Sequence, residues 1–513
     1  MVKVVYVPLD ERPCNYKYPQ MLADMTDIEL AVPNVTVLGQ KKTPADFDKL
    51  REWIVSEVRT ANYLLISIDL LVYGGIVPSR LHHLSVEECK RRMELLQEVK
   101  SINPNIKIYA FNLIMRAPAY SSSEEEPDYY DAYGEQIFLY GRYTDRMDKG
   151  VIEKEEKVEL LEIEKMIPEE VLLDFLTRRE VNHQINELSI DYVEDEVIDH
   201  LVIPLDDNAP YGYTSHEQKR LVEKVEQLNL MDQVYIYPGA DEIGCTLFAR
   251  IFTEVKDYVP EVYVRYSSTN GPFITPKFED RTLNESIKAQ LTSVNAFMAD
   301  SSTGTDCVLM VNSPAIGGKK MADDTQENKH YTYYSEVNHR EFMQAIKGYL
   351  RKNKTIALAD VAIINGGDHY LLKALHKQGL LPEITAYAGW NTSGNTLGTV
   401  IAHVIICSYY EKNNLSDYVA ASQLFYVYRL IEDWLFQSII REKVTVGSLP
   451  SINASYFKLI HVKESVIEIV ERELKNLTST LLSDFLSYEI SAVDLPWDRM
   501  FEVDFTVEKK RLH

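Results

Sequence analysis

Two adjacent aspartates, Asp206 and Asp207, follow directly after an apolar run in the stretch "HLVIPLDDN". Neighbouring carboxylates repel each other unless a cation, a ligand or a shared proton relieves the repulsion. A shared proton raises the pKa of one carboxyl toward neutrality, which is what a general acid requires. The stretch therefore predicts an acid/base pair. The alternative is a simple strand-to-helix turn, because Asp and Asn favour turns through hydrogen bonds to nearby backbone groups.

Short runs rich in Val, Ile, Leu and Tyr recur along the chain, and nearly all carry their polar residues at the C-terminal end. Most are followed by a stretch with helical periodicity, which is typical of parallel strands joined by helical crossovers. The nine runs span 2–13, 63–75, 106–116, 200–208, 233–242, 262–271, 306–314, 361–370 and 384–395. Ligands bind at the C-terminal edge of the strands both in barrels and in open parallel sheets. We therefore expect the polar ends of these runs to form the site.

This pattern predicts an α/β protein, either a TIM-like (β/α) barrel or a related parallel-sheet domain. Nine runs are one more than such a barrel needs, so a closed barrel and two open sheets both remain possible architectures. Residues 1–415 are predicted to form the α/β catalytic-type domain, with an insertion at about 121–199 that is either a lid or a peripheral elaboration. Residues 416–513 are predicted to form a mostly helical module that ends in a strand-like segment, "RMFEVDFTVEKK".

The composition narrows the classes of partner. Lys and Arg number 54 against 78 Asp and Glu, which gives a net charge of −24. Such a charge repels phosphate backbones and anionic membrane surfaces, so we expect neither nucleic acid nor membrane as a partner. The N-terminal "MVKVVYVPLDERP" has no export-signal pattern, and the five cysteines are scattered without zinc or disulfide spacing. These features predict a cytoplasmic protein.

Several loops together resemble a known family. The stretches "YVPLDERPCNYKYP", "SIDLLVYGGIVPSR", "INGGDHY", "AGWNTSGNTLG" and "LPWDRMFEVDF" are similar to an uncharacterised bacterial family, domain of unknown function 4127. The resemblance covers essentially the whole chain. It implies that these loops form one site, and it leaves the chemistry to be argued from the residues.

Polar side chains near the ends of the other runs are predicted to hold the substrate. Carboxylates bind sugar hydroxyls, arginines recognise anionic groups or form ion pairs at the rim, and the Gly-rich "GWNTSGNTLG" offers backbone N–H groups to an anion. Trp390 is expected either to stack on a sugar or simply to pack. The full set is Asp10, Arg12, Asn15, Asp69, Arg80, Asn112, Arg116, Asp241, Glu242, Asn312, Asp368, Trp390, Asn391 and Asn395.

The aspartate pair resembles the strand-terminal pair of retaining glycosidases that use the substrate's acetamido group as the nucleophile. In that scheme Asp206 orients the acetamide and Asp207 protonates the leaving oxygen. We therefore predict a glycoside hydrolase-like enzyme without a cofactor, acting on a small or oligomeric carbohydrate, of which one that contains an N-acetylhexosamine is an example. One alternative is a hydrolase of a phosphorylated or amide substrate that depends on a divalent cation such as Mg²⁺, Mn²⁺ or Ca²⁺. Another is a carbohydrate-binding protein without catalysis.

Overall fold

The computed structural model of this protein describes residues 1–316 and 321–510. The chain divides into two compact units, each with its own parallel sheet. Unit 1 comprises Met1–Glu11, Asp27–Gly244 and Phe278–Arg281, and unit 2 comprises Arg12–Thr26, Cys245–Lys277 and Thr282–His513.

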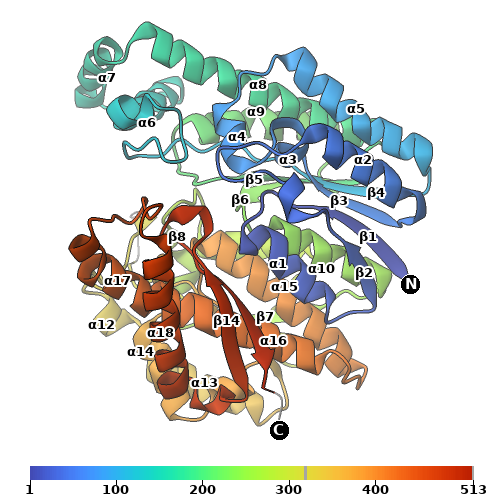
Figure 1. Cartoon of the computed structure of the whole chain (residues 1–513), viewed down its shortest axis with the longest axis vertical. Coiled ribbons are helices and arrows are strands. Elements are labelled where there is room, and N and C mark those ends of the chain that lie inside the picture. The colour runs from blue at the N-terminus through green and yellow to red at the C-terminus, as the bar shows by residue number, and fades with distance from the viewer. Residues whose placement is uncertain (317–320, 511–513) are drawn as a thin grey trace. The chain divides into compact units, whose positions relative to one another are not determined.

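The sheet of unit 1 has six parallel strands in the order β2-β1-β3-β4-β5-β6 (Figure 1). The strands are β1 (Val2–Val7), β2 (Ile28–Ala31), β3 (Tyr63–Ser67), β4 (Lys107–Phe111), β5 (His200–Leu205) and β6 (Val234–Pro238). Every residue of β3 and β5 is buried, which is why these strands appear in the sequence as continuous apolar runs. The order brings the C-terminal ends of β3, β4 and β5 together at one edge.

The helices of unit 1 pack beside one another along this sheet. They are α2 (Phe47–Glu57), α3 (Ile68–Tyr73), α4 (Ile76–Leu81), α5 (Val86–Ile102), α6 (Tyr130–Asp148), α7 (Lys154–Met166), α8 (Glu169–Glu194) and α9 (Tyr213–Gln227). Helix α5 contacts α2, α3 and α8, and α8 in turn contacts α9 and β5. The chain thus leaves β3 through two short helices, α3 and α4, before the longer α5 returns it to the sheet.

The predicted insertion, 121–199, is largely helical and consists mostly of α6, α7 and α8. Its apolar core is made by Tyr130, Ile137, Tyr143, Leu160, Ile163, Ile167 and Phe175, together with Met115, which precedes the insertion. Because α8 also contacts β5, the insertion is anchored to the sheet that carries the aspartate pair. Its role as a lid stays a prediction.

The sheet of unit 2 has five parallel strands in the order β13-β12-β10-β7-β9. These are β7 (Glu261–Tyr266), β9 (Phe297–Ala299), β10 (Cys307–Asn312), β12 (Thr355–Asp360) and β13 (Ala386–Ala388). Helix α15 (Ser393–Lys412) contacts β10, β12 and β13 and is buried along nearly its whole length. It is apolar on all sides because α1 (Pro13–Ala23) and α11 (Leu283–Ser293) also pack against it.

The remaining elements of unit 2 surround this sheet and include the predicted C-terminal module. They include β8 (Thr275–Pro276), β11 (Met321–Ala322), α12 (Tyr333–Glu336), α13 (His339–Leu350), α14 (His369–Lys377), α16 (Val419–Arg429), the π-helix η5 (Leu430–Ile440), α17 (Arg441–Gly447), α18 (Lys463–Leu481), β14 (Tyr488–Asp494) and β15 (Asp504–Lys509). Helix α10 (Ile243–Val255) spans the point where the chain passes from unit 1 to unit 2. The strand predicted in "RMFEVDFTVEKK" is confirmed as β15, which pairs with β14. The domain boundary at residue 415 stays a prediction.

The predicted parallel-sheet α/β architecture is confirmed. A closed barrel is not confirmed, because the strands pair into two sheets that each have two edge strands. The strand predicted at 361–370 is wrong: β12 ends at Asp360, and 361–370 forms a loop and the start of α14. The apolar run continues across Asp360, so hydrophobicity alone marks no boundary there. Within residues 1–316 and 321–510, none of the helices combines the length and the apolar composition that a membrane span requires.

Candidate functional site

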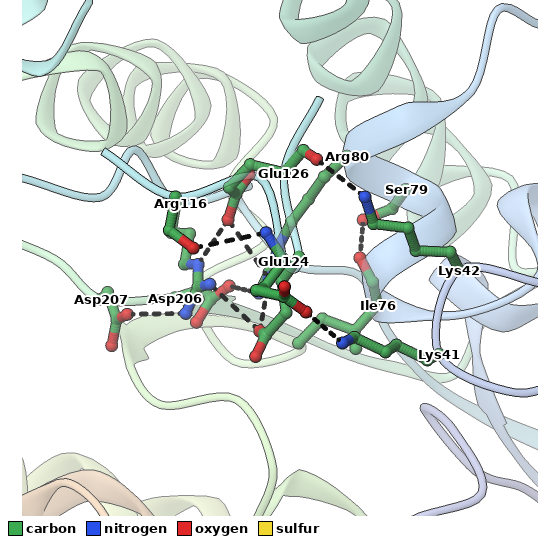
Figure 2. Close-up of polar contacts among 12 residues, drawn as sticks. Lys41, Lys42, Ile76, Ser79, Arg80, Arg116, Glu124, Glu126, Asp206 and Asp207 are labelled. Atoms are coloured by element: carbon green, nitrogen blue, oxygen red, sulfur yellow. Dashed lines mark hydrogen bonds and ion pairs between the residues drawn. The ribbon is translucent and has the colours of Figure 1, made fainter. Parts of the chain in front are cut away.

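Two arginines of unit 1 bind four carboxylates in one cluster (Figure 2). Each guanidinium contacts both glutamates and one aspartate. Arg80 lies 2.7 Å from Asp206, 3.2 Å from Glu125 and 3.5 Å from Glu126. Arg116 lies 2.9 Å from Glu126, 3.1 Å from Glu125 and 3.2 Å from Asp207. We call these six residues the carboxylate–arginine cluster.

The two arginines come from the ends of neighbouring strands. Arg80 lies on α4, which begins after a sharp turn at Gly74 and Gly75. Gly74 has φ +95°, and a Cβ there would lie 2.5 Å from the Pro44 side chain, so this turn requires glycine. Arg116 follows β4, five residues after the strand ends at Phe111. The sheet order therefore brings both guanidinium groups to the C-terminal edge.

The two aspartates follow β5 directly. Strict strand alternation would point their side chains in opposite directions. Asp207 instead adopts φ +42°, in the left-handed region that Asp tolerates better than most residues. Because the chain turns at this point, Asp206 meets Arg80 while Asp207 meets Arg116.

The two glutamates were not predicted from the sequence, and they come from the start of the insertion. Lys41 forms a 2.9 Å ion pair with Glu124, and Lys42 donates to the Ser123 carbonyl over 2.7 Å (Figure 2). These two lysines hold the acidic segment beside the arginines. The triplet of Glu residues at 124–126 was the available signal, although such a run normally indicates a solvated surface.

The cluster holds four carboxylates and two guanidinium groups, so it favours protonation of a carboxyl. Burial and the charge of Asp206 raise the pKa of Asp207 to about 6, although Arg116 and Arg80 oppose the shift. The side chain of Asp207 is 23% exposed, against 9% for Asp206. Asp207 is therefore the carboxyl of the cluster that is accessible to a ligand and that binds a proton with a pKa near neutrality.

Asp69 is a second carboxyl whose pKa is raised in this unit. It lies in the first turn of α3, is buried, and accepts a hydrogen bond of 2.9 Å from the Leu113 backbone N–H. Burial, helped by the negative charge of Asp206, raises the pKa of Asp69 to about 7. The predicted residues Asp69, Arg80, Arg116, Asp206 and Asp207 thus influence one another.

The other predicted residues of unit 1 lie buried after β1, β4 and β6. Asn112 donates to Ser189 Oγ over 3.4 Å. Glu242 is fully buried and accepts a hydrogen bond from the Ala240 backbone N–H over 2.9 Å. Asp10 and Asp241 are also almost completely buried.

Two predicted residues of unit 2, Asn312 and Asp368, lie on either side of Asp360. The Asn312 amide donates to Asp360 Oδ1 over 2.8 Å, and the Asp368 backbone N–H donates to Asp360 Oδ2 over 2.7 Å. Burial and the Asp368 carboxylate raise the pKa of Asp360 to about 8. Asp360 was not predicted as a site residue. The sequence pattern placed the strand at 361–370, whereas β12 ends at Asp360.

Trp390 does not present a face to a sugar. Its ring is 1% exposed and lies 6.2 Å from the ring of Phe501 in an edge-on arrangement, so the packing interpretation is the one supported. The prediction that the Gly-rich stretch offers its backbone N–H groups to a bound anion is also wrong at its first glycine, Gly389. The Gly389 N–H donates over 2.7 Å to the buried carboxylate of Asp433, so the anion that it binds belongs to the protein itself.

The remaining predicted residues of unit 2 lie in α1 and around the start of α15. The Arg12 guanidinium lies 4.6 Å from the centre of the Trp497 ring, and Asn15 is buried in α1. The Asn391 carbonyl accepts from the Asn365 N–H over 3.1 Å. Asn395 lies in the first turn of α15, where its amide donates to Thr392 Oγ1 over 3.1 Å.

In the part of the chain that the structure describes, no three His, Cys, Asp or Glu side chains are arranged to hold a metal ion. The divalent cation that the sequence leaves as an alternative stays a prediction. The carboxylates of the cluster are bound by arginine instead.

A family model described as protein of unknown function (DUF4127) matches residues 4–506. The chain belongs to this family. The resemblance noted in the loop sequences is thereby confirmed. A comparison with curated proteins found no match. The activity of this DUF4127 member therefore has to be inferred from its side chains.

Proposed function

We propose that this protein is a glycoside hydrolase in which Asp206 and Asp207 carry out the reaction. The observation that supports this proposal most strongly is the difference between the two neighbours. Asp206 is nearly buried and bound by Arg80, whereas Asp207 is more exposed and has a pKa of about 6. A carboxyl whose pKa is raised toward neutrality, next to a second carboxylate held by an arginine, is suited to acid/base chemistry.

The proposed reaction begins with Asp206, whose carboxylate accepts a hydrogen bond from the substrate's acetamido N–H and orients that group. The acetamido oxygen attacks the anomeric carbon, the glycosidic bond breaks, and Asp207 gives its proton to the leaving oxygen. The Asp207 carboxylate then takes a proton from a water molecule, whose oxygen adds to the anomeric carbon and regenerates the acetamide. Glu125 and Glu126 hold Arg80 and Arg116 in place during both steps.

Two kinds of substrate test the roles separately. Hydrolysis of chito-oligosaccharides requires a proton on the leaving oxygen. The 4-nitrophenolate group of 4-nitrophenyl N-acetylhexosaminides leaves without being protonated. We expect Asp207→Asn to lose at least about a hundredfold in kcat on the oligosaccharides, with a much smaller loss on the 4-nitrophenyl substrates. Asp206→Asn should lose activity on both. Asp232→Asn, at an exposed aspartate before β6, is the control and should retain full activity.

Other outcomes would replace this proposal. Full activity of Asp207→Asn on oligosaccharides would remove Asp207 as the acid. Loss of activity in chelator, with recovery on addition of Mg²⁺, would favour the metal-dependent hydrolase. Saturable binding of the oligosaccharides without turnover would favour a carbohydrate-binding protein.

We further propose that the protein acts in the cytoplasm. All five cysteines lie within the described residues as buried thiols rather than disulfides. Thiols in this state are typical of a reducing compartment.

A further inference from the structure

A group of tyrosines in unit 2 is far more exposed than most aromatic side chains. Tyr331, Tyr334 and Tyr370 are 77%, 78% and 64% exposed. Tyr333 links two of them, since its ring lies 5.5 Å from that of Tyr334 and both it and Tyr370 contact Lys329. We call Tyr331, Tyr333, Tyr334 and Tyr370 the tyrosine surface. Exposed tyrosine rings combine an apolar face with a polar edge and are common where ligands bind.

Lys329 lies between two rings of this surface and is only 3% exposed. Its Nζ is 4.1 Å from the centre of the Tyr333 ring and 4.6 Å from that of Tyr370. Among the described residues Nζ has no hydrogen-bond acceptor, and the nearest carboxylate oxygen, on Asp368, is 3.6 Å away. A buried donor without an acceptor is unfavourable. An oxygen atom of a bound molecule would satisfy it.

A hollow of about 520 Å³ adjoins Tyr370, which is one of its lining residues. This volume lies within the usual range for small-molecule sites, roughly 300–1,000 Å³. Its lining includes the polar residues Gln326, Glu327, His369, Ser438 and Glu442, beside a larger apolar area to which Ile439 and Val446 contribute. It therefore suits a ligand that combines apolar faces with hydrogen-bonding groups.

The hollow carries charges of both signs. Glu327 and Glu442 lie close together, and a hydrogen bond between them raises the pKa of Glu442. Lys443 is a positive charge that is paired with Glu473 over 2.7 Å, and burial lowers the pKa of His369. A strongly anionic ligand would meet the glutamate pair, and a cationic ligand would meet Lys329. An uncharged polar ligand avoids both repulsions.

We propose that the tyrosine surface and the adjoining hollow form a carbohydrate-binding site in unit 2 that takes an uncharged oligosaccharide. The C–H faces of the sugar rings pack on the tyrosines, and hydroxyl oxygens accept hydrogen bonds from Lys329 and the polar lining. This site uses none of the residues of the carboxylate–arginine cluster. It therefore does not depend on the proposed hydrolysis.

Isothermal titration calorimetry of the full chain tests the site, with chitotetraose and cellotetraose as probes. The Asp207→Asn background slows turnover of the probe by about a hundredfold or more during the titration. We expect at least one probe to bind, and we expect the Tyr331→Ala/Tyr334→Ala double variant to raise its Kd by about tenfold or more. Both side chains are exposed, so the double variant should fold normally. Phe297→Ala is the control, because Phe297 is a 48% exposed aromatic residue on β9 of the same unit, and its Kd should be unchanged.

Lys329→Met gives a second measurement, since methionine keeps the length of the side chain and removes the N–H donors. We expect it to weaken binding of the same probe by about tenfold. Failure of both probes to bind, or an unchanged Kd in the tyrosine and lysine variants, would overturn this proposal. The double tyrosine variant should hydrolyse 4-nitrophenyl N-acetylhexosaminides at the wild-type rate. Loss of that activity in Asp206→Asn bears only on the proposed function.

Discussion

Arg80 and Asp206 form an ion pair of 2.7 Å whose side chains are only 2% and 9% exposed. Such a pair loses much of its hydration on folding, and the attraction between the charges has to offset that loss. Removing one partner is consequently much more unfavourable than removing a partner from a surface pair. The pair holds Asp206 in a fixed orientation at the end of β5, which is what an orienting carboxylate needs.

Arg80→Met should lower the free energy of unfolding by about 3–5 kcal/mol at neutral pH, because Asp206 and Glu126 lose a buried counter-charge. Denaturant unfolding measures the change. Arg51→Met is the matched control, since Arg51 binds Glu98 at 2.7 Å but the two side chains are 43% and 37% exposed. That change should alter the stability by less than about 1 kcal/mol. Equal effects of the two variants would contradict the buried character of the Arg80 pair.

Asp69→Asn should change how the stability of the protein depends on pH. In the folded protein Asp69 has a pKa of about 7, against about 3.9 for an aspartate in an unfolded chain. The stability that this group contributes is therefore fully present below about pH 4 and is lost as the pH rises through about 7, by up to about 4 kcal/mol. The Asp69→Asn variant does not lose this stability when the pH rises.

The test for Asp69 is the difference in unfolding free energy between variant and wild type, measured by denaturant at about pH 5 and about pH 8. The difference should shift in favour of the Asp69→Asn variant at the higher pH, because other titrating groups cancel between the two proteins. A difference that does not change with pH would show that the pKa of Asp69 is not raised.

The parallel strands could be predicted because β3, β5 and β10 are buried on both faces and therefore read as unbroken apolar runs. The meeting of Asp206 and Asp207 with Arg80 and Arg116 followed from the same pattern, since polar residues at the ends of parallel strands collect at one edge. The distribution of the strands over two sheets did not follow, because pairing depends on contacts between residues distant in sequence.

Side chains supplied by loops were the hardest to predict. Glu125 and Glu126 lie in the loop that precedes α6, where Lys41 and Lys42 bind the neighbouring residues, and neither lysine carries a local signal. Asp433 lies in the π-helix η5, more than forty residues after Gly389, and accepts a hydrogen bond from the Gly389 N–H. Such contacts are a product of tertiary packing, which periodicity does not encode.

Two glycines of unit 2 should respond in opposite ways to alanine. A Cβ at Gly389 would lie 2.7 Å from the Tyr387 hydroxyl and 3.0 Å from the Gly367 Cα, so Gly389→Ala should destabilise the protein by roughly 1–3 kcal/mol. Gly348 lies within α13, and a Cβ there would meet no atom within 4 Å. Gly348→Ala should stabilise the protein by about 0.5–1 kcal/mol, because alanine favours helix more than glycine does. Denaturant unfolding measures both, and stabilisation by Gly389→Ala would contradict the close packing at that turn.

The pKa of Asp207 should move in opposite directions when its two charged neighbours are removed. The Asp206 carboxylate raises it and the Arg116 guanidinium lowers it, so Asp206→Asn should bring it below about 6 and Arg116→Gln should bring it above about 6. Carboxyl ¹³C NMR titration, with Asp207→Asn used to assign the signal, gives both values without requiring a substrate. Asp232→Asn is distant in sequence and exposed, and it should leave the titration unchanged.

Only the protonated form of a general acid is active, so the alkaline limb of the pH–rate profile should fall near pH 6 and shift with each variant in the same direction as the NMR value. A limb that stayed fixed while the NMR pKa moved would mean that another group donates the proton.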